Sequence, residues 1–144
     1  MTLSLWMLLG FAGWTLLIMV VGVGTYRWLL IFKGEAALTS FPGDVAHGSP
    51  AYRRITRAHA NCIENLPVFA VIVLVAAVAG INPPPMGLLA AVTLAARIAQ
   101  SSIHMFLSES NGTVGVRFSC FLIQVFTMSA MAYLLVTAAA GKIQ

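Results

Sequence analysis

The sequence predicts an all-α integral membrane protein, folded as a bundle of four transmembrane helices. Of its 144 residues, 60% are hydrophobic and only 8% are charged. An average soluble domain has about 45–50% apolar and about 25% charged residues, so this chain cannot cover a water-facing surface with polar groups. An intrinsically disordered chain would have few hydrophobic and many charged residues, which is the opposite of this composition. We therefore expect one membrane domain over residues 1–144.

The first expected helix covers about Leu3 to Phe32. No residue from Met1 to Tyr26 is charged, and this run is longer than the apolar core of a signal peptide, which has about 7–15 residues. A basic start and an Ala-x-Ala cleavage site are also missing. The segment is therefore expected to remain as a transmembrane helix.

A loop is expected after the first helix, because the segment from Lys33 to Ala51 collects residues that favour turns. These residues are Gly34, Pro42, Gly43, Asp44, Gly48 and Pro50. Ser49 is placed to cap the start of the next helix.

The second and third helices are expected at about residues 51–79 and 86–107. Between Asn65 and Ala96 no residue is charged, but successive prolines at Pro83, Pro84 and Pro85 cannot continue a helix and divide this run. Ser108 to Gly115 is expected to be a connector, and the fourth helix to cover about residues 116–140. Each helix is long enough to cross about 30 Å of hydrocarbon.

Basic residues near the helix ends predict the orientation. Six of them lie near the first and third loops, whereas Lys142 is near a span end on the opposite side. The positive-inside tendency then places loops 1 and 3 in the cytoplasm and both termini on the other side, in an inner or plasma membrane. The six residues are Arg27, Lys33, Arg53, Arg54, Arg57 and Arg117.

Two other classes of function are disfavoured. The net charge of +4 comes from basic residues beside apolar runs, which favours membrane topology over nucleic-acid binding. Cys62 and Cys120 lie inside apolar segments without metal-ligand spacing, which argues against a disulfide framework or a zinc site.

Polar residues inside the spans are the candidates for function, because a bilayer makes each of them costly. On the second helix, Arg57, Asn61 and Glu64 fall at roughly 300°, 340° and 280° from Arg54, so the four residues form one stripe. The arginines could simply extend to the membrane interface, and Glu64 could pair with an arginine of a neighbouring helix. The full stripe instead suits a zwitterionic polar ligand.

A second stripe lies on the third helix. Arg97, Gln100, Ser101 and His104 follow the spacing i, i+3, i+4, i+7 and share one face. Arg97 is too far inside the span to face lipid, which leaves pairing with Glu64 and direct ligand binding as alternatives. A lone histidine such as His104 is more often structural.

Tryptophans and glycines of the first span are weaker signals. Trp14 lies too deep in the span for an interfacial aromatic belt. The glycines, among them Gly22 and Gly24, favour close packing of helices.

The second-helix motif resembles a signature of the MAPEG family, the membrane-associated proteins in eicosanoid and glutathione metabolism. The motif is Arg54-x-x-Arg57-Ala58-x-x-Asn61-x-x-Glu64, followed by Pro67. The four-span layout, Arg97 and Arg117 are also similar to that family, so the resemblance covers nearly the whole chain.

The resemblance implies a homotrimer that binds glutathione between subunits at the cytoplasmic side. Residues matching Arg54, Arg57, Asn61 and Glu64 line or brace the glutathione site in the family, and we expect Arg97 and His104 to belong to it. Arginines suit the two carboxylates of glutathione, and Glu64 suits its ammonium group. The arginine matching Arg117 is the candidate for stabilising the thiolate.

The expected function is therefore a glutathione-dependent transferase or peroxidase that acts on apolar electrophiles or lipid hydroperoxides. Glutathione is the cosubstrate, and membrane lipid surrounds the protein. His104, Phe118 and Phe121 stand where several eicosanoid-processing members carry hydroxyl groups, which leaves a non-catalytic glutathione- or lipid-binding protein as the alternative. A small transporter is a third hypothesis, raised only by Arg97 and Glu64.

Overall fold

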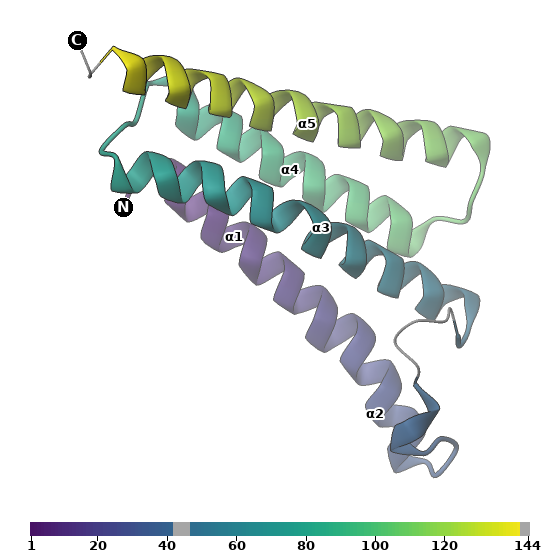
Figure 1. Cartoon of the computed structure of the whole chain (residues 1–144). Coiled ribbons are helices and arrows are strands. Elements are labelled where there is room, and N and C mark those ends of the chain that lie inside the picture. Colours follow the sequence, from purple (N-terminus) through teal and green to yellow (C-terminus); the bar gives the residue numbers. More distant parts are fainter. Residues whose placement is uncertain (42–46, 142–144) are drawn as a thin grey trace.

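Four long helical spans run up and down beside one another in the computed structural model, which describes residues 1–41 and 47–141 (Figure 1). Each span is long and apolar enough to cross a membrane, which confirms the predicted all-α membrane bundle. Both ends of the chain lie at one end of the bundle, and the first and third loops lie at the other. Pro42, Gly43, Asp44 and Lys142, which entered the sequence-based expectations, lie outside the described residues.

The first span consists of three helical segments that follow one another directly. These are α1 (Leu3–Leu17), the π-helix η1 (Ile18–Gly24) and α2 (Thr25–Phe32). The Thr2 side chain accepts a hydrogen bond from the Leu5 amide and begins α1. The Thr25 amide bonds to the Val20 carbonyl, five residues back, so the helix is widened here. The π-helix was not predicted, although the overall span was.

The first loop carries a short 3₁₀ helix, η2 (Leu38–Ser40), and leads to α3 (Pro50–Val78). Ser49 caps α3 as predicted, because its side chain accepts a hydrogen bond from the Tyr52 amide at 3.2 Å. Pro50 occupies the first turn, where a missing amide hydrogen costs nothing. The helix continues through Pro67 to its end.

The last two spans are α4 (Pro85–Phe106) and α5 (Asn111–Ala140). The predicted proline-rich break before α4 is confirmed. The expected start of the fourth helix near residue 116 was wrong, because α5 begins at Asn111. A reciprocal cap explains the earlier start: Ser110 accepts from the Thr113 amide at 3.2 Å, and Thr113 accepts from the Ser110 amide at 2.9 Å. The cap outweighs the low helix propensity of Gly112 and Gly115.

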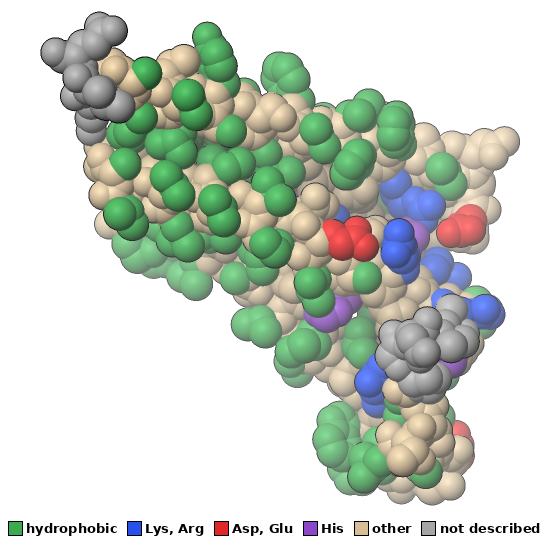
Figure 2. All heavy atoms as spheres, in the orientation of Figure 1, with side chains coloured by type: hydrophobic (Ala, Val, Ile, Leu, Met, Phe, Trp, Pro, Cys, Tyr) green, Lys and Arg blue, Asp and Glu red, His purple; other side chains and the backbone are tan. Residues whose placement is uncertain are grey.

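The interior of the bundle is mainly apolar. Phe11 of α1 packs on Phe69 of α3, with ring centroids 5.7 Å apart, and both side chains are fully buried. A polar contact joins α4 to α5, where the hydroxyls of Thr93 and Thr127 lie 2.8 Å apart. Hydrophobic side chains cover most of the visible face, and the charged ones gather toward the end with the first and third loops (Figure 2).

Candidate functional site

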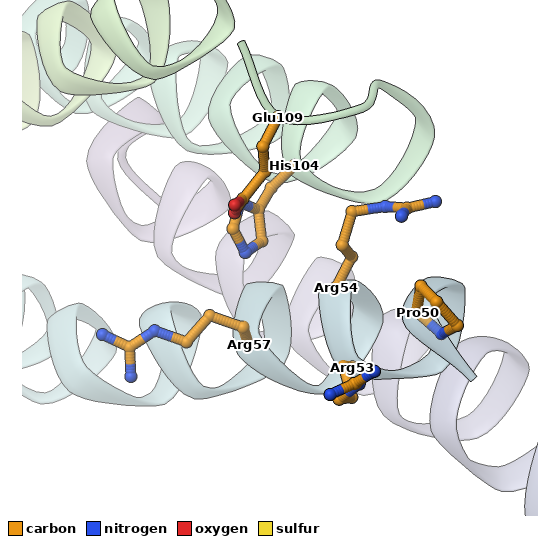
Figure 3. A pocket seen from close by; sticks show the side chains of 6 residues that line it. All are labelled: Pro50, Arg53, Arg54, Arg57, His104 and Glu109. Carbon is orange, nitrogen blue, oxygen red and sulfur yellow. The ribbon is translucent and has the colours of Figure 1, made fainter. Parts of the chain in front are cut away.

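A basic pocket of about 410 Å³ lies at this charged end of the bundle. It is lined by the start of α3, the end of α4 and the loop that follows α4 (Figure 3). Three arginines supply most of its polar groups, and one histidine and one carboxylate complete them. We call it the arginine pocket, and its lining residues are Pro50, Arg53, Arg54, Arg57, His104 and Glu109.

Arg54 and Arg57 share a face of α3, as predicted, but their side chains extend in opposite directions along the helix (Figure 3). The Arg54 Nε donates to the backbone carbonyl of Met105 at 3.5 Å, which holds the start of α3 against the end of α4. Arg57 extends toward Glu64 and pairs with it at 3.9 Å. Arg54 and Arg57 therefore place their cations at two separated positions of the arginine pocket.

The Arg57–Glu64 pair lies on the outer surface of the subunit. The Arg57 side chain is 64% exposed and that of Glu64 is 59% exposed. Ile63 and Val68, which are also exposed, flank Glu64 along the helix. This stripe is a polar patch on an otherwise apolar face, and Glu64 itself does not line the arginine pocket of the same subunit.

Arg117 of α5 reaches the pocket through His104. Its Nη1 contacts Nδ1 of the imidazole, and it also pairs with the Glu109 carboxylate at 3.8 Å. Because a guanidinium can only donate, Nδ1 of His104 must accept, and the ring proton then lies on Nε2. That Nε2 is buried and has no hydrogen-bond partner among the described residues. His104 thus offers an unused donor beside three arginines.

The stripe predicted on α4 separates into different roles. His104 lines the arginine pocket, whereas the Ser101 hydroxyl donates to the Arg97 carbonyl at 2.7 Å. Arg97 is only 1% exposed, and its guanidinium lies 5.7 Å from the centre of the Phe11 ring. Its Nε and Nη2 have no partner among the described residues.

Besides Glu64, two more of the predicted glutathione-binding residues lie apart from the arginine pocket in this subunit. Arg97 is enclosed by the bundle, and no ion pair between it and Glu64 occurs in the part of the chain that the structure describes. Asn61 is half-buried on α3, where its backbone carbonyl accepts from the Asn65 side chain at 3.2 Å. Neither residue lines the pocket.

Several residues of this region were not predicted from the sequence as site residues. Arg53 and Glu109 line the pocket, although Arg53 was used only to predict orientation. Gln124, which is fully buried, donates to the Gln100 side chain at 3.0 Å, and Gln100 donates to the Arg117 carbonyl at 3.0 Å. Gln124 follows Arg117 by seven residues on an apolar helix, and this spacing could have indicated a shared face.

Comparison with known families identifies the chain. The sequence profile of the MAPEG family matches residues 4–137, which is nearly the whole chain. The chain belongs to the MAPEG family. The chain matches no curated protein and no solved structure. This MAPEG chain is thus a multi-pass integral membrane protein, related to glutathione through its family.

Proposed function

We propose that this MAPEG protein is a glutathione-dependent transferase or peroxidase that acts on apolar electrophiles or lipid hydroperoxides. The observation that carries the proposal is the arginine pocket, which is lined by three arginines and by a histidine held by Arg117. Its volume of about 410 Å³ lies within the usual range of small-molecule sites, about 300–1,000 Å³.

The charges of the pocket are complementary to glutathione. Glutathione has two carboxylates, and the separated guanidinium groups of Arg54 and Arg57 can each bind one. Its ammonium group requires an anion, and two carboxylates are near: Glu109 lines the pocket and Glu64 pairs with Arg57. We assign the ammonium group to Glu64, and Glu109 is the other candidate. Asn61 and Arg97 would support this site from α3 and α4.

Arg117 and His104 together can stabilise the thiolate. The Arg117 cation beside the imidazole favours the charged nucleophile. The Nε2–H of His104 is buried and unpaired in the isolated subunit, and it can donate to the sulfur once the ring turns toward the ligand. In conjugation, the thiolate forms a C–S bond with the electrophilic carbon, and the leaving group departs with its electron pair. In the peroxidase reaction, the thiolate attacks the terminal oxygen of the hydroperoxide, so that an S–O bond forms, the O–O bond breaks, and the lipid alkoxide leaves and takes up a proton to become the alcohol. A second glutathione thiol then attacks the sulfur of the resulting sulfenic acid, which yields glutathione disulfide and water.

A homotrimer is part of the proposal. An ion pair that is 64% and 59% exposed on an apolar helix face is costly in a bilayer unless protein covers it. A neighbouring subunit that packs against this part of α3 would shelter the pair and enclose the site. We further propose that the end with the first and third loops faces the cytoplasm of an inner or plasma membrane.

A second candidate function is non-catalytic binding of glutathione or a lipid. It is supported by the lining of the arginine pocket, where none of the six side chains is a hydroxyl. Phe118, which follows Arg117 directly, is a phenylalanine and supplies no hydroxyl beside Arg117 either. In this candidate the arginines bind the ligand, and no thiolate forms.

A titration with glutathione, followed by thiolate absorbance, separates the two candidates. Purified protein should form a thiolate and conjugate a generic aryl halide, and Arg117→Ala should abolish both while it leaves the glutathione Kd within about threefold. Phe118→Ala, one residue away, is the matched control and should keep the thiolate. Binding without any thiolate in the unmutated protein would favour the non-catalytic candidate.

A further inference from the structure

Glu109 lies between the arginine pocket and Arg117, the cation proposed to stabilise the thiolate. Arg117 itself does not line the pocket, whereas its two side-chain partners, His104 and Glu109, do. Both partners meet the same nitrogen, because Nη1 of Arg117 contacts Nδ1 of His104 and lies 3.8 Å from Oε1 of Glu109. The side chains of His104 and Glu109 extend into the pocket from the same side (Figure 3). A ligand in the pocket therefore meets these two side chains before it meets Arg117.

The two charges of the Arg117–Glu109 pair differ in their exposure to solvent. The Arg117 side chain is only 16% exposed, whereas that of Glu109 is 69% exposed. A largely enclosed guanidinium needs an anionic partner more than an exposed carboxylate needs a cation. Because one partner is so exposed, the pair is weak and changes an equilibrium constant by at most about fivefold. A ligand anion can therefore replace the carboxylate.

The backbone of Glu109 is held on both sides, so its side chain is the part that can move. The Thr113 hydroxyl donates to the Ser108 carbonyl at 3.0 Å and accepts from the Ser110 amide at 2.9 Å. These two bonds tie both neighbours of Glu109 to the first turn of α5. A change of rotamer, with the loop in place, is then sufficient to carry the carboxylate away from Arg117.

We propose that Glu109 is the resting counter-ion of Arg117 and that the sulfur anion of bound glutathione displaces it. This inference rests on the proposed function, and it makes Glu109 a positioning residue that competes with the thiolate for one cation. Two neighbouring anions disfavour each other, so the carboxylate keeps the bound thiol protonated until it turns away. The thiol proton then passes to solvent, and the thiolate takes the place of the carboxylate beside Nη1. The ammonium group of glutathione remains with Glu64.

A different role for Glu109 predicts the opposite change in affinity. If the carboxylate bound the ammonium group of glutathione, removal of its charge would weaken binding, because an attraction would be lost. If the carboxylate competes with the sulfur, removal of its charge strengthens binding. The sign of the change in affinity therefore decides between the two roles.

Glu109→Gln, made in the full chain and purified in detergent micelles, tests the proposal because it removes the charge and keeps the shape. Two ligands are titrated: glutathione, and S-methylglutathione, which has the same carboxylates and ammonium group but no ionisable thiol. The variant should bind glutathione about two- to fivefold more tightly, and it should hold a larger fraction of it as thiolate at the same pH. Its Kd for S-methylglutathione should stay unchanged.

Two further variants make the test specific. Glu35→Gln removes an exposed acid of the first loop, at the same end of the bundle, and should leave both dissociation constants unchanged. In an Arg117→Ala background, Glu109→Gln should no longer strengthen glutathione binding, because the cation for which the two anions compete is gone. Circular dichroism checks that all variants keep the same helix content.

Three results for Glu109→Gln would overturn the inference: weaker binding of both ligands, equally stronger binding of both ligands, or an unchanged Kd and thiolate fraction. Weaker binding would instead assign the ammonium group to Glu109. A thiolate that forms equally with and without the Glu109 charge would overturn this inference alone. Absence of a thiolate from both proteins would overturn the proposed function as well.

Discussion

Arg117 and His104 are 13 residues apart in the chain, yet the guanidinium of Arg117 contacts Nδ1 of the His104 ring. The contact joins α5 to α4 and fixes the ring proton on the nitrogen that has no partner among the described residues. His104 thus supplies the hydrogen-bond donor, and Arg117 determines which ring nitrogen of His104 carries the proton.

Replacing His104 should lower turnover more than it lowers glutathione binding. His104→Phe removes the donor, and we expect kcat for conjugation to fall by about 100-fold, as when one donor to a developing anion is lost. His104→Gln, which keeps a donor and an acceptor, should retain more activity. Steady-state kinetics with an aryl halide measures both, and an unchanged kcat in His104→Phe would contradict the assigned role.

The glutamine pair should position Arg117. Gln124→Leu leaves the Gln100 oxygen without this donor, and we expect a loss of about 1–3 kcal/mol in the free energy of unfolding, together with a lower kcat. Removing both partners in Gln100→Leu/Gln124→Leu should cost less than the sum of the single changes. Unfolding in mixed micelles gives the coupling, with Ser129→Ala as the control at an exposed site of α5. Strict additivity would refute the pairing.

Arg97 should contribute to stability mainly through its volume. Arg97 is the largest of the fully buried side chains among the described residues. Arg97→Ala should therefore leave a cavity and lower the free energy of unfolding by about 2–5 kcal/mol. Arg97→Met fills most of that space without a charge, and we expect it to be clearly more stable than Arg97→Ala. Thermal unfolding compares the two variants. Equal stability would show that the charge, not the volume, is what matters at this position.

Glu64 should affect assembly and glutathione binding, with little effect on the fold of the subunit. An exposed ion pair contributes about 0–1 kcal/mol within one chain. Glu64→Gln should therefore leave helix content unchanged, weaken glutathione binding, and reduce the trimer seen by native mass spectrometry. Thr137→Val, at an exposed site of α5, is the control. A stable trimer with normal affinity would remove Glu64 from both roles.

Composition and helix periodicity were sufficient to predict the bundle, since the apolar runs and the proline cluster are local signals. The α3 stripe was also predictable, because Arg54 and Arg57 are one turn apart. The opposite directions of their side chains were not predictable, because each arginine has a different partner. Arg54 donates to the Met105 carbonyl on α4, whereas Arg57 pairs with Glu64 on α3. Periodicity shows which residues share a helix face, but it does not show what that face contacts.

The meeting of His104 with Arg117 required tertiary information. It depends on the early start of α5 at Asn111, which the Ser110 cap determines. A connector was expected over this segment from the sequence, so that start was not predicted. The burial of Arg97 likewise depends on Phe11 from a distant helix. Glu109 joined the site because the short loop after α4 places it at the same pocket as the start of α3, a placement that no residue pattern encodes.

The π-helix in the first span sets the rotational register of α2, the segment that follows it in the same span. A widened turn accommodates more residues over the same rise, so the sequence beyond Gly24 is rotated relative to the sequence before Ile18. With this offset, Arg27 donates to the Tyr52 hydroxyl at 2.6 Å, and Tyr26 stacks on the Tyr52 ring. Deleting one residue between positions 18 and 24 would turn both side chains by about 100°. The helix would stay intact, but α2 would lose these two contacts with the start of α3.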